Sequence, residues 1–206
     1  MNRTLGRIAV IGLVLGLGIS CPVWGQARLQ VADFQDQPYQ ATFAGGKFLR
    51  LHLHDGDFRI VGSETNSIHI TATGKKLGEA HKIKFDFSRV GDTVNLKLSH
   101  VPKNELQVTI AIPRDSNLFA RMRGGDLSVE GVTGDKDLKL TGGDLSIQVG
   151  NPEDYAHVDL SVRFGDVSGS QFGDPKGWIG NSVKRDGTGK HELLAHVFAG
   201  DLILKP

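Results

Sequence analysis

Apolar and polar residues alternate with a period of two over most of the chain after residue 40. Between 49 and 54, leucines alternate with arginine and histidine, and similar runs follow at 58–60, 68–70, 83–87, 94–98 and 106–112. A period of two is typical of half-buried β-strands, whereas an amphipathic helix spaces its apolar residues three or four apart. Clusters of Gly, Asp, Ser, Asn and Pro separate the runs and predict turns. Only 75–82 has room for a helical turn, and we treat it as a loop.

From Leu118 onward the pattern becomes repetitive. Four related strings contain a Gly-Asp pair: GGDLSVEG (124–131), GGDLSIQVG (142–150), FGDVSG (164–169) and AGDLIL (199–204). The string DGDFRIVG at 55–62 is an early relative. Their aspartates are 18, 22 and 35 residues apart, and 35 is close to twice the shorter intervals. We therefore expect one degenerate copy between Ser168 and Lys190. Self-similarity near 20 residues indicates stacked units.

The alternation around each Gly-Asp pair predicts which side chains face inward. The third and fifth residues before the glycine are apolar in every copy. The first and third residues after the aspartate are also apolar, except Gly169. The predicted inward residues are Met122, Ala120, Leu140, Leu138, Val162, Leu160, Val197, Ala195, Leu127, Val129, Leu145, Ile147, Val167, Leu202 and Leu204. Each copy consists of a strand, a tight corner and a second strand. One such unit cannot bury its apolar face alone, but stacked copies can bury it against one another.

We therefore predict an all-β fold: a short β-solenoid or rolled sheet of Gly-Asp-Leu repeats, preceded by a strand-rich N-terminal half. It forms a single domain over 40–206, with N-terminal strands at 40–112 and repeat coils at 113–206.

The first 25 residues have the pattern of a secretory signal peptide. Arg3 and Arg7 precede twelve residues without a polar side chain, and small residues precede a cleavage site after Gly25. A membrane-spanning helix needs about 20 apolar residues, so we predict no membrane span. Lipid anchoring through Cys21 is the less favoured interpretation, since the usual upstream Leu is missing and Pro22 follows. We predict an exported protein, periplasmic or extracellular, with a flexible segment at 26–39.

Composition narrows the function classes. The chain has 206 residues, 39% hydrophobic and 23% charged, with a formal net charge of +1. These values are typical of a globular domain and exclude a broad basic surface for nucleic acid. The single cysteine lies in the predicted signal peptide. The mature chain then has no disulfide and no thiolate chemistry, and we expect no cofactor.

The repeat region is similar to a known family. VTIAIPRDSNLFARMRGGDLSVEGVTGDKDLKLTGGDLSI and LLAHVFAGDLIL, behind a signal peptide and a strand-rich first half, resemble the putative-adhesin family of bacterial envelope proteins, a β-strand-repeat domain of unknown function. The resemblance covers roughly 40–206. It implies a non-enzymatic, all-β envelope protein with an adhesin-like role, and it supplies no catalytic residues.

Three residue sets are candidates for metal or catalytic chemistry. Asp126, Asp144, Asp166 and Asp201 suggest a calcium column, but one aspartate per coil at uneven spacing favours carboxylates that accept backbone N–H groups in their own turn. His52, His54 and His69 suggest zinc, but a solvated polar face is the favoured interpretation. In HELLAH (191–196) the histidines are five apart, not four, which excludes the zinc-protease motif.

The Gly-rich loop 169–189 is the predicted partner-contact surface, through Phe172, Lys176, Trp178 and Arg185. The alternative is that Trp178 and Ile179 plug the end of the solenoid.

We predict a non-enzymatic exported scaffold or adhesin-like module that binds an envelope protein or a glycan. The alternatives are a small carbohydrate-active β-helix enzyme, with Asp126, Asp144 and Asp166 as first candidates, and a self-assembling structural element. The last strand, 201–204, leaves an exposed edge next to Lys205 and Pro206, residues that blunt edge pairing and favour a monomer.

Overall fold

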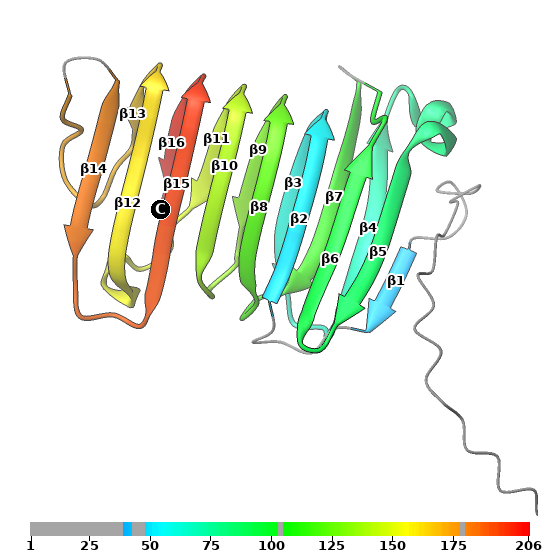
Figure 1. Cartoon of the computed structure of the whole chain (residues 1–206), viewed down its shortest axis with the longest axis horizontal. Helices are drawn as coiled ribbons and strands as arrows, with labels where there is room; N and C mark the ends of the chain where they lie inside the picture. Colours follow the sequence, from blue (N-terminus) through cyan, green and yellow to red (C-terminus); the bar gives the residue numbers. More distant parts are fainter. Residues whose placement is uncertain (1–38, 43–47, 103–104, 178–179) are drawn as a thin grey trace, which may run out of the picture.

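The computed structural model describes residues 39–42, 48–102, 105–177 and 180–206 (Figure 1). The predictions for the signal peptide, for residues 26–38 and for Trp178 and Ile179 lie outside these residues. Within them the chain is all-β, as predicted, with two short 3-10 turns, η1 (Leu77–Lys82) and η2 (Pro152–Asp154). The loop expected at 75–82 thus contains η1, closed by a hydrogen bond from the Ile83 N–H to the Ala80 carbonyl. No helix in the described ranges is long and apolar enough to span a membrane.

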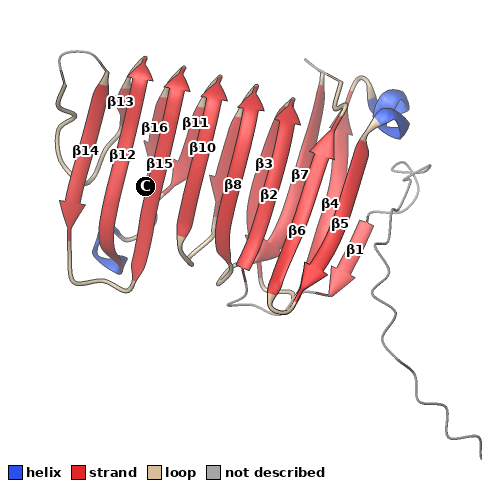
Figure 2. Cartoon of the chain, viewed as in Figure 1, coloured by secondary structure: helices blue, strands red, loops and turns tan. Residues whose placement is uncertain are grey.

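The strands form two mixed eight-stranded sheets that lie one behind the other (Figures 1 and 2). Alternate residues of both sheets are apolar and buried. Sheet A has the order β1-β4-β7-β3-β9-β11-β16-β13, and sheet B has the order β14-β12-β15-β10-β8-β2-β6-β5. The strands of sheet A are β1 (Tyr39–Thr42), β4 (Ser67–Gly74), β7 (Leu106–Pro113), β3 (Asp57–Ser63), β9 (Leu127–Glu130), β11 (Leu145–Gln148), β16 (Leu202–Lys205) and β13 (Val167–Ser168). Those of sheet B are β14 (Asn181–Asp186), β12 (Tyr155–Phe164), β15 (His191–Ala199), β10 (Lys136–Gly142), β8 (Asn117–Gly124), β2 (Phe48–Asp55), β6 (Thr93–Ser99) and β5 (Lys84–Val90).

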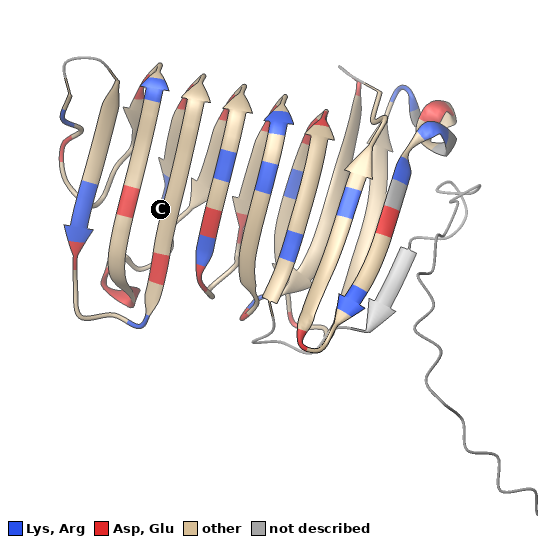
Figure 3. Cartoon of the chain, in the orientation of Figure 1, with Lys and Arg blue, Asp and Glu red and all other residues tan. Residues whose placement is uncertain are grey.

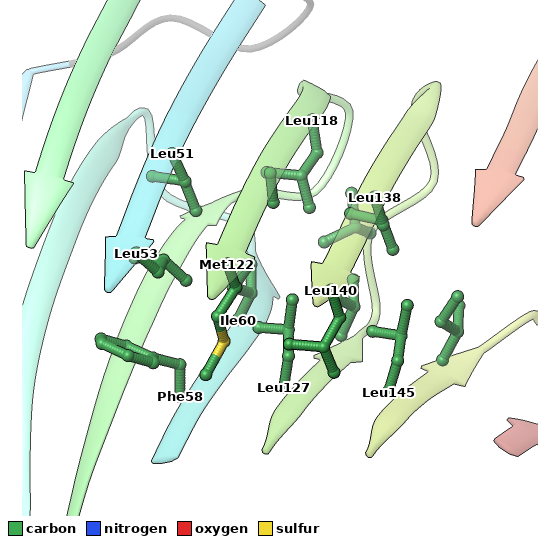
Figure 4. Close-up of a cluster of buried hydrophobic side chains, with 14 of the residues drawn as sticks. Leu51, Leu53, Phe58, Ile60, Leu118, Met122, Leu127, Leu138, Leu140 and Leu145 are labelled. Carbon is green, nitrogen blue, oxygen red and sulfur yellow. The ribbon is translucent and has the colours of Figure 1, made fainter. Parts of the chain in front are cut away.

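Each Gly-Asp pair joins a strand of sheet B to a strand of sheet A, and we call such a unit a coil. The coils are β2/β3, β8/β9, β10/β11, β12/β13 and β15/β16, and they pair in parallel. In sheet A, Leu145 lies opposite Leu127 and Leu202, and all three side chains are at most 1% exposed. Figure 4 shows side chains of both sheets pointing into this shared interior. The inward residues predicted from the alternation are buried, Gly169 aside.

The coils do not stack in the order of the sequence. Coil β15/β16 lies between β10/β11 and β12/β13, and coil β2/β3 lies between β8/β9 and the strands β6 and β7. The prediction of a degenerate copy between Ser168 and Lys190 is therefore wrong. After the two-residue strand β13 the chain reverses, and β14 pairs antiparallel with β12 at the edge of sheet B. The long interval between Asp166 and Asp201 holds this reversed strand and the return to β15.

The last strand is not an edge, which corrects the prediction for 201–204. Leu202 pairs with Leu145 of β11 on one side and Val167 of β13 on the other. The edges of sheet B are β5 and β14, both antiparallel to their neighbours, and those of sheet A are β1 and β13. Strands outside the coils thus end sheet B on both sides and sheet A at β1, and such end strands limit continued stacking of coils.

The corners fix the distance between coils. The N–H of Gly125 donates to the Gly142 carbonyl at 3.0 Å, and the N–H of Gly143 donates to the Ala199 carbonyl at 2.9 Å. At Gly143, φ is +112°, and a Cβ there would lie 2.7 Å from the carbonyl carbon of Gly125 and closer still to its oxygen. Only glycine combines this backbone conformation with so close an approach.

One lysine lies inside the core. Lys136 at the start of β10 is 1% exposed, and its Nζ donates to the Gly134 carbonyl at 2.9 Å and to the Tyr155 hydroxyl at 3.0 Å. Burial lowers the pKa of this ammonium to about 8, partly opposed by Asp135 and Asp154. Burial also raises the pKa of the Tyr155 hydroxyl to about 12. Folding therefore disfavours the charged forms of both groups.

The free energy of unfolding is expected to rise with pH above about 8, because the native chain then loses the Lys136 proton that the unfolded chain keeps up to its ordinary pKa. One such proton contributes about 2 kcal/mol between roughly pH 7.5 and 9.5. Above about pH 10 the trend reverses, since the unfolded chain then loses the Tyr155 proton that the native chain retains.

Urea denaturation across this pH range measures the free energy of unfolding and tests the expectation. The rise with pH should disappear in Lys136→Met. It should remain in the control Lys139→Met, which replaces an exposed lysine. An unchanged pH profile in Lys136→Met would contradict the assignment.

Candidate binding face on sheet B

The corner aspartates connect neighbouring coils. Asp126 Oδ1 accepts the N–H of Asp144 at 3.2 Å, Asp144 Oδ1 accepts that of Asp201 at 3.0 Å, and Asp201 Oδ1 accepts that of Asp166 at 2.9 Å. The ladder ends where the Asn181 amide donates to Asp166 Oδ1 at 2.8 Å. The prediction that each carboxylate accepts within its own turn is wrong, since the donor belongs to the next coil. The reason is that the stack brings each corner within hydrogen-bond distance of its neighbour.

Within the described residues, the histidines considered as candidates do not assemble into a metal centre. His52 lies on β2 in sheet B, whereas His69 lies on β4 in sheet A, where it hydrogen-bonds the Ser67 hydroxyl at 2.7 Å. On strand β15, His191 contacts Asp135 and His196 contacts Ser161. Among the described residues, no three His, Cys, Asp or Glu side chains are grouped to hold a metal ion.

The residues predicted for partner contact have different surroundings. Phe172 is 7% exposed and packs edge-on against Tyr155, with ring centroids 5.7 Å apart. Arg185 forms an ion pair with Glu153 at 2.6 Å. Lys176 is exposed and is held by backbone hydrogen bonds to Ser182. Of these three residues, only Lys176 lines a groove, the second described below.

A row of basic side chains crosses the outer face of sheet B. The parallel register places five residues opposite one another on five adjacent strands: Lys97 of β6, His52 of β2, Arg121 of β8, Lys139 of β10 and His196 of β15. Arg123 and Arg163 follow two residues further along β8 and β12. We call Lys97, Arg121, Arg123, Lys139 and Arg163 the cationic face. Figure 3 shows its Lys and Arg positions on β6, β8, β10 and β12, with the acidic positions of β10, β12 and β15 nearer the other end of these strands.

Two adjoining grooves hollow this face. The first, about 510 Å³, is lined by Lys97, Arg121, Arg123, Lys139 and the two histidines of β2. The second, about 540 Å³, lies over β10, β15, β12 and β14 and is lined by polar, cationic and aromatic groups: Lys139, Thr141, Ser161, Arg163, Lys176, Asn181, Ser182, His196 and Phe198. Lys139 and Thr141 line both grooves. The described lining contains no Asp or Glu, so every Lys and Arg side chain in it adds positive charge and no lining carboxylate opposes it.

The centre of the face is rigidly held. Arg121 donates to the Asp137 carboxylate at 2.7 Å and to the Asp137 carbonyl at 2.8 Å, and its guanidinium lies 3.6 Å from the centroid of the Phe119 ring. Burial, above all, lowers the pKa of His196, so this ring is neutral near pH 7 and pairs with the Ser161 hydroxyl at 2.7 Å. The charge of the face therefore comes from its lysines and arginines.

Three of these cations form no ion pair with the acidic side chains of the described residues. Within the described part of the chain, Lys97, Arg123 and Lys139 are exposed and make no ion pair with an acidic side chain. A bound anion therefore does not have to displace any described carboxylate from them.

Sequence reasoning missed this face, although the repeats contained a usable signal. Arg121, Arg123, Lys139 and Arg163 all occupy outward positions shortly before a corner. The sequence identifies these positions, but only the register shows that they form one surface.

No family model and no curated protein sequence matches the chain. Among solved structures, it is similar to a putative cell adhesion protein from Clostridium sporogenes, with a TM-score of 0.48, 14% identity, and coverage of 82% of this chain and 99% of that one. A putative adhesin from Bacteroides fragilis has a TM-score of 0.28 and 10% identity, over 82% of this chain and 96% of that one. These names agree with the family resemblance of the repeats. The scores are too low for the neighbours to indicate the function of this chain.

Proposed function

We propose that this chain is a non-enzymatic, exported binding module of the cell envelope, built as a short β-solenoid of Gly-Asp-Leu coils. Its binding surface is the outer face of sheet B. The observation that carries the proposal is the pair of grooves whose described lining contains five Lys or Arg side chains besides Lys176 and no carboxylate. Such a lining attracts an anionic partner and disfavours a cationic one.

The lining supports binding over catalysis. Glycoside hydrolysis in most enzymes uses two carboxyl groups placed on either side of the scissile bond. Here Asp126, Asp144 and Asp166, the first candidates for such a role, accept hydrogen bonds within the corner ladder instead of lining the grooves. Asp137, the acidic residue beside Arg121, is engaged by that guanidinium.

The two ends of sheet B support a module that acts alone over a self-assembling element. Because β5 and β14 run antiparallel to their neighbours, a further parallel coil would meet a reversed strand at either edge of sheet B. The backbone of β14 is also partly engaged, since Lys176 and Ser182 exchange two hydrogen bonds of 2.9 Å. Edges of this kind suppress addition of further copies.

Binding to isolated envelopes of the cells that produce the chain tests the proposal. We expect the purified exported chain to cosediment with them, and the charge reversal Arg123→Glu with Lys139→Glu to reduce the bound fraction about tenfold. The double variant Lys75→Glu with Lys190→Glu makes the same change in net charge at exposed lysines away from the grooves and should bind like the parent. Equal loss in both double variants, or no cosedimentation of the parent, would contradict the proposal.

Export is tested separately. Fractionation of the producing cells should place the chain outside the cytoplasm, and N-terminal sequencing should begin at Gln26. A full-length chain retained in the cytoplasm would contradict an envelope role.

A further inference from the structure

We infer that the occupant of the cationic face is an anionic polysaccharide carrying carboxylates, a polymer of uronic acids, that lies across the strands of sheet B along the stacking direction. This inference rests on the proposed function and names the class of its ligand. Three features of the face carry it: the repeat of its cations, the neutral groups beside them and the aromatic rings at one end.

The cations recur in the direction in which the coils stack. Neighbouring strands lie about 4.8 Å apart, so side chains in one register form a row with that spacing. Arg121 and Lys139 occupy adjacent strands of this row, and Lys97 lies two strands from Arg121, across β2. A linear polymer with an anionic group on each unit can contact several of these cations at once. A small anion can contact only one or two of them, and its binding would not benefit from the row.

The two grooves form one continuous surface on which such a polymer can lie. They meet at Lys139 and Thr141, so the combined surface extends over β6, β2, β8, β10, β15, β12 and β14. Arg121 is fixed by Asp137 and by the Phe119 ring, which reduces the side-chain entropy lost when a carboxylate binds it. Lys97, Arg123 and Lys139 are exposed and form no ion pair with a described acidic side chain.

The second groove has the chemistry of a sugar site. Ser161, Asn181 and Ser182 line it with hydroxyl and amide groups whose oxygens can accept from sugar hydroxyls. The Asn181 amide N–H groups already donate to Gly165 and Asp166, and the Ser182 hydroxyl donates to the Lys176 carbonyl. Phe198, which is 51% exposed, packs edge-on against Phe164, with centroids 5.4 Å apart. Together these two rings offer an apolar patch beside the cations, suited to the apolar face of a sugar ring.

A nucleic acid fits this surface less well. Single strands bind through stacking of bases on open aromatic faces and through a broadly basic surface. The ring nearest the centre of the row, Phe119, already has Arg121 over its face and Arg50 within 5.4 Å of its centroid. The whole chain has a formal net charge of only +1. The chain is thus not broadly basic.

Calorimetric titration of the exported chain with three uronate polymers, polygalacturonate, alginate and hyaluronate, tests the inference. At least one should bind, and Arg123→Ala and Lys139→Ala should each raise its Kd about tenfold, the loss expected for a charge-assisted hydrogen bond. Lys190→Ala serves as the exposed-lysine control and should leave the Kd unchanged. Fully methyl-esterified polygalacturonate, which keeps the backbone but loses the charges, should not bind.

Several results would overturn the inference. One is that none of the three polymers binds, and another is that the esterified polymer binds as tightly as the charged one. A third is that Lys190→Ala loses as much affinity as Arg123→Ala and Lys139→Ala. The last is that single-stranded DNA binds more tightly than the uronates. Thermal unfolding of each variant establishes that a lost interaction does not reflect a lost fold. Envelope binding that depends on Arg123 and Lys139 without uronate binding would leave the proposed function standing and overturn only the ligand class.

Discussion

Replacing Gly143 with alanine is expected to destabilise the chain by about 4 kcal/mol or more, enough to prevent folding of a marginally stable domain. The new methyl group would lie 2.7 Å from the carbonyl carbon of Gly125, and φ at this position is +112°. Neither backbone can withdraw, because Gly125 and Gly143 donate to the next coils at 3.0 and 2.9 Å. The substitution must therefore separate coils that share a core.

The adjacent Gly142 provides the matched control. A Cβ there would meet only the Arg123 carbonyl, at 3.9 Å, and the neighbouring coil holds Ala199 at the same register position. Gly142→Ala should therefore change the free energy of unfolding by no more than about 1 kcal/mol. Urea denaturation followed by circular dichroism compares the two variants. Similar losses in both would show that close approach of the corners does not hold the coils together.

Leu145→Ala is expected to cost about 2–5 kcal/mol, the range for truncating a buried leucine. Leu145 is 0% exposed and lies between Leu127 and Leu202 in sheet A. Both neighbours are held by parallel pairing, so the stack cannot easily collapse into the space left behind. Leu140→Ala, on the sheet B side of the same coil, should behave alike, since Leu140 is 2% exposed.

Lys139→Ala, one residue before Leu140, is the control and should stay within about 0.5 kcal/mol of the parent chain. Its side chain is exposed on the cationic face. Chemical denaturation that gave equal losses for Leu140 and Lys139 would mean that the inward face is assigned wrongly. The same variant is expected to lose affinity for the anionic ligand, so stability and binding respond to opposite faces of one strand.

Local features of the sequence determined the coil. The Gly-Asp pair fixes a corner because only glycine accepts its backbone conformation, and alternation on either side fixes the inward face, since successive residues of a strand point to opposite sides. The burial of Leu127, Leu145 and Leu202 was predictable on this basis. The same alternation places Lys136 on the inward face, four residues before Leu140. A lysine is ordinarily exposed, so its residue type does not predict that it is buried there.

The order of the coils was decided only by the tertiary structure. Each coil presents the same apolar face and the same corner hydrogen bonds, so any coil can stack on any other, and the pattern alone does not rank the arrangements. Specific long-range packing places β15/β16 inside the stack and β14 at its edge, which turns the expected C-terminal edge into an interior strand. The cationic face depends on this order, because Lys97, Arg121 and Lys139 become neighbours only after the strands that carry them are paired. The sequence by itself thus determined the repeating unit, its buried side and its corner, while the structure decided how the units are ordered and which outward charges share one surface.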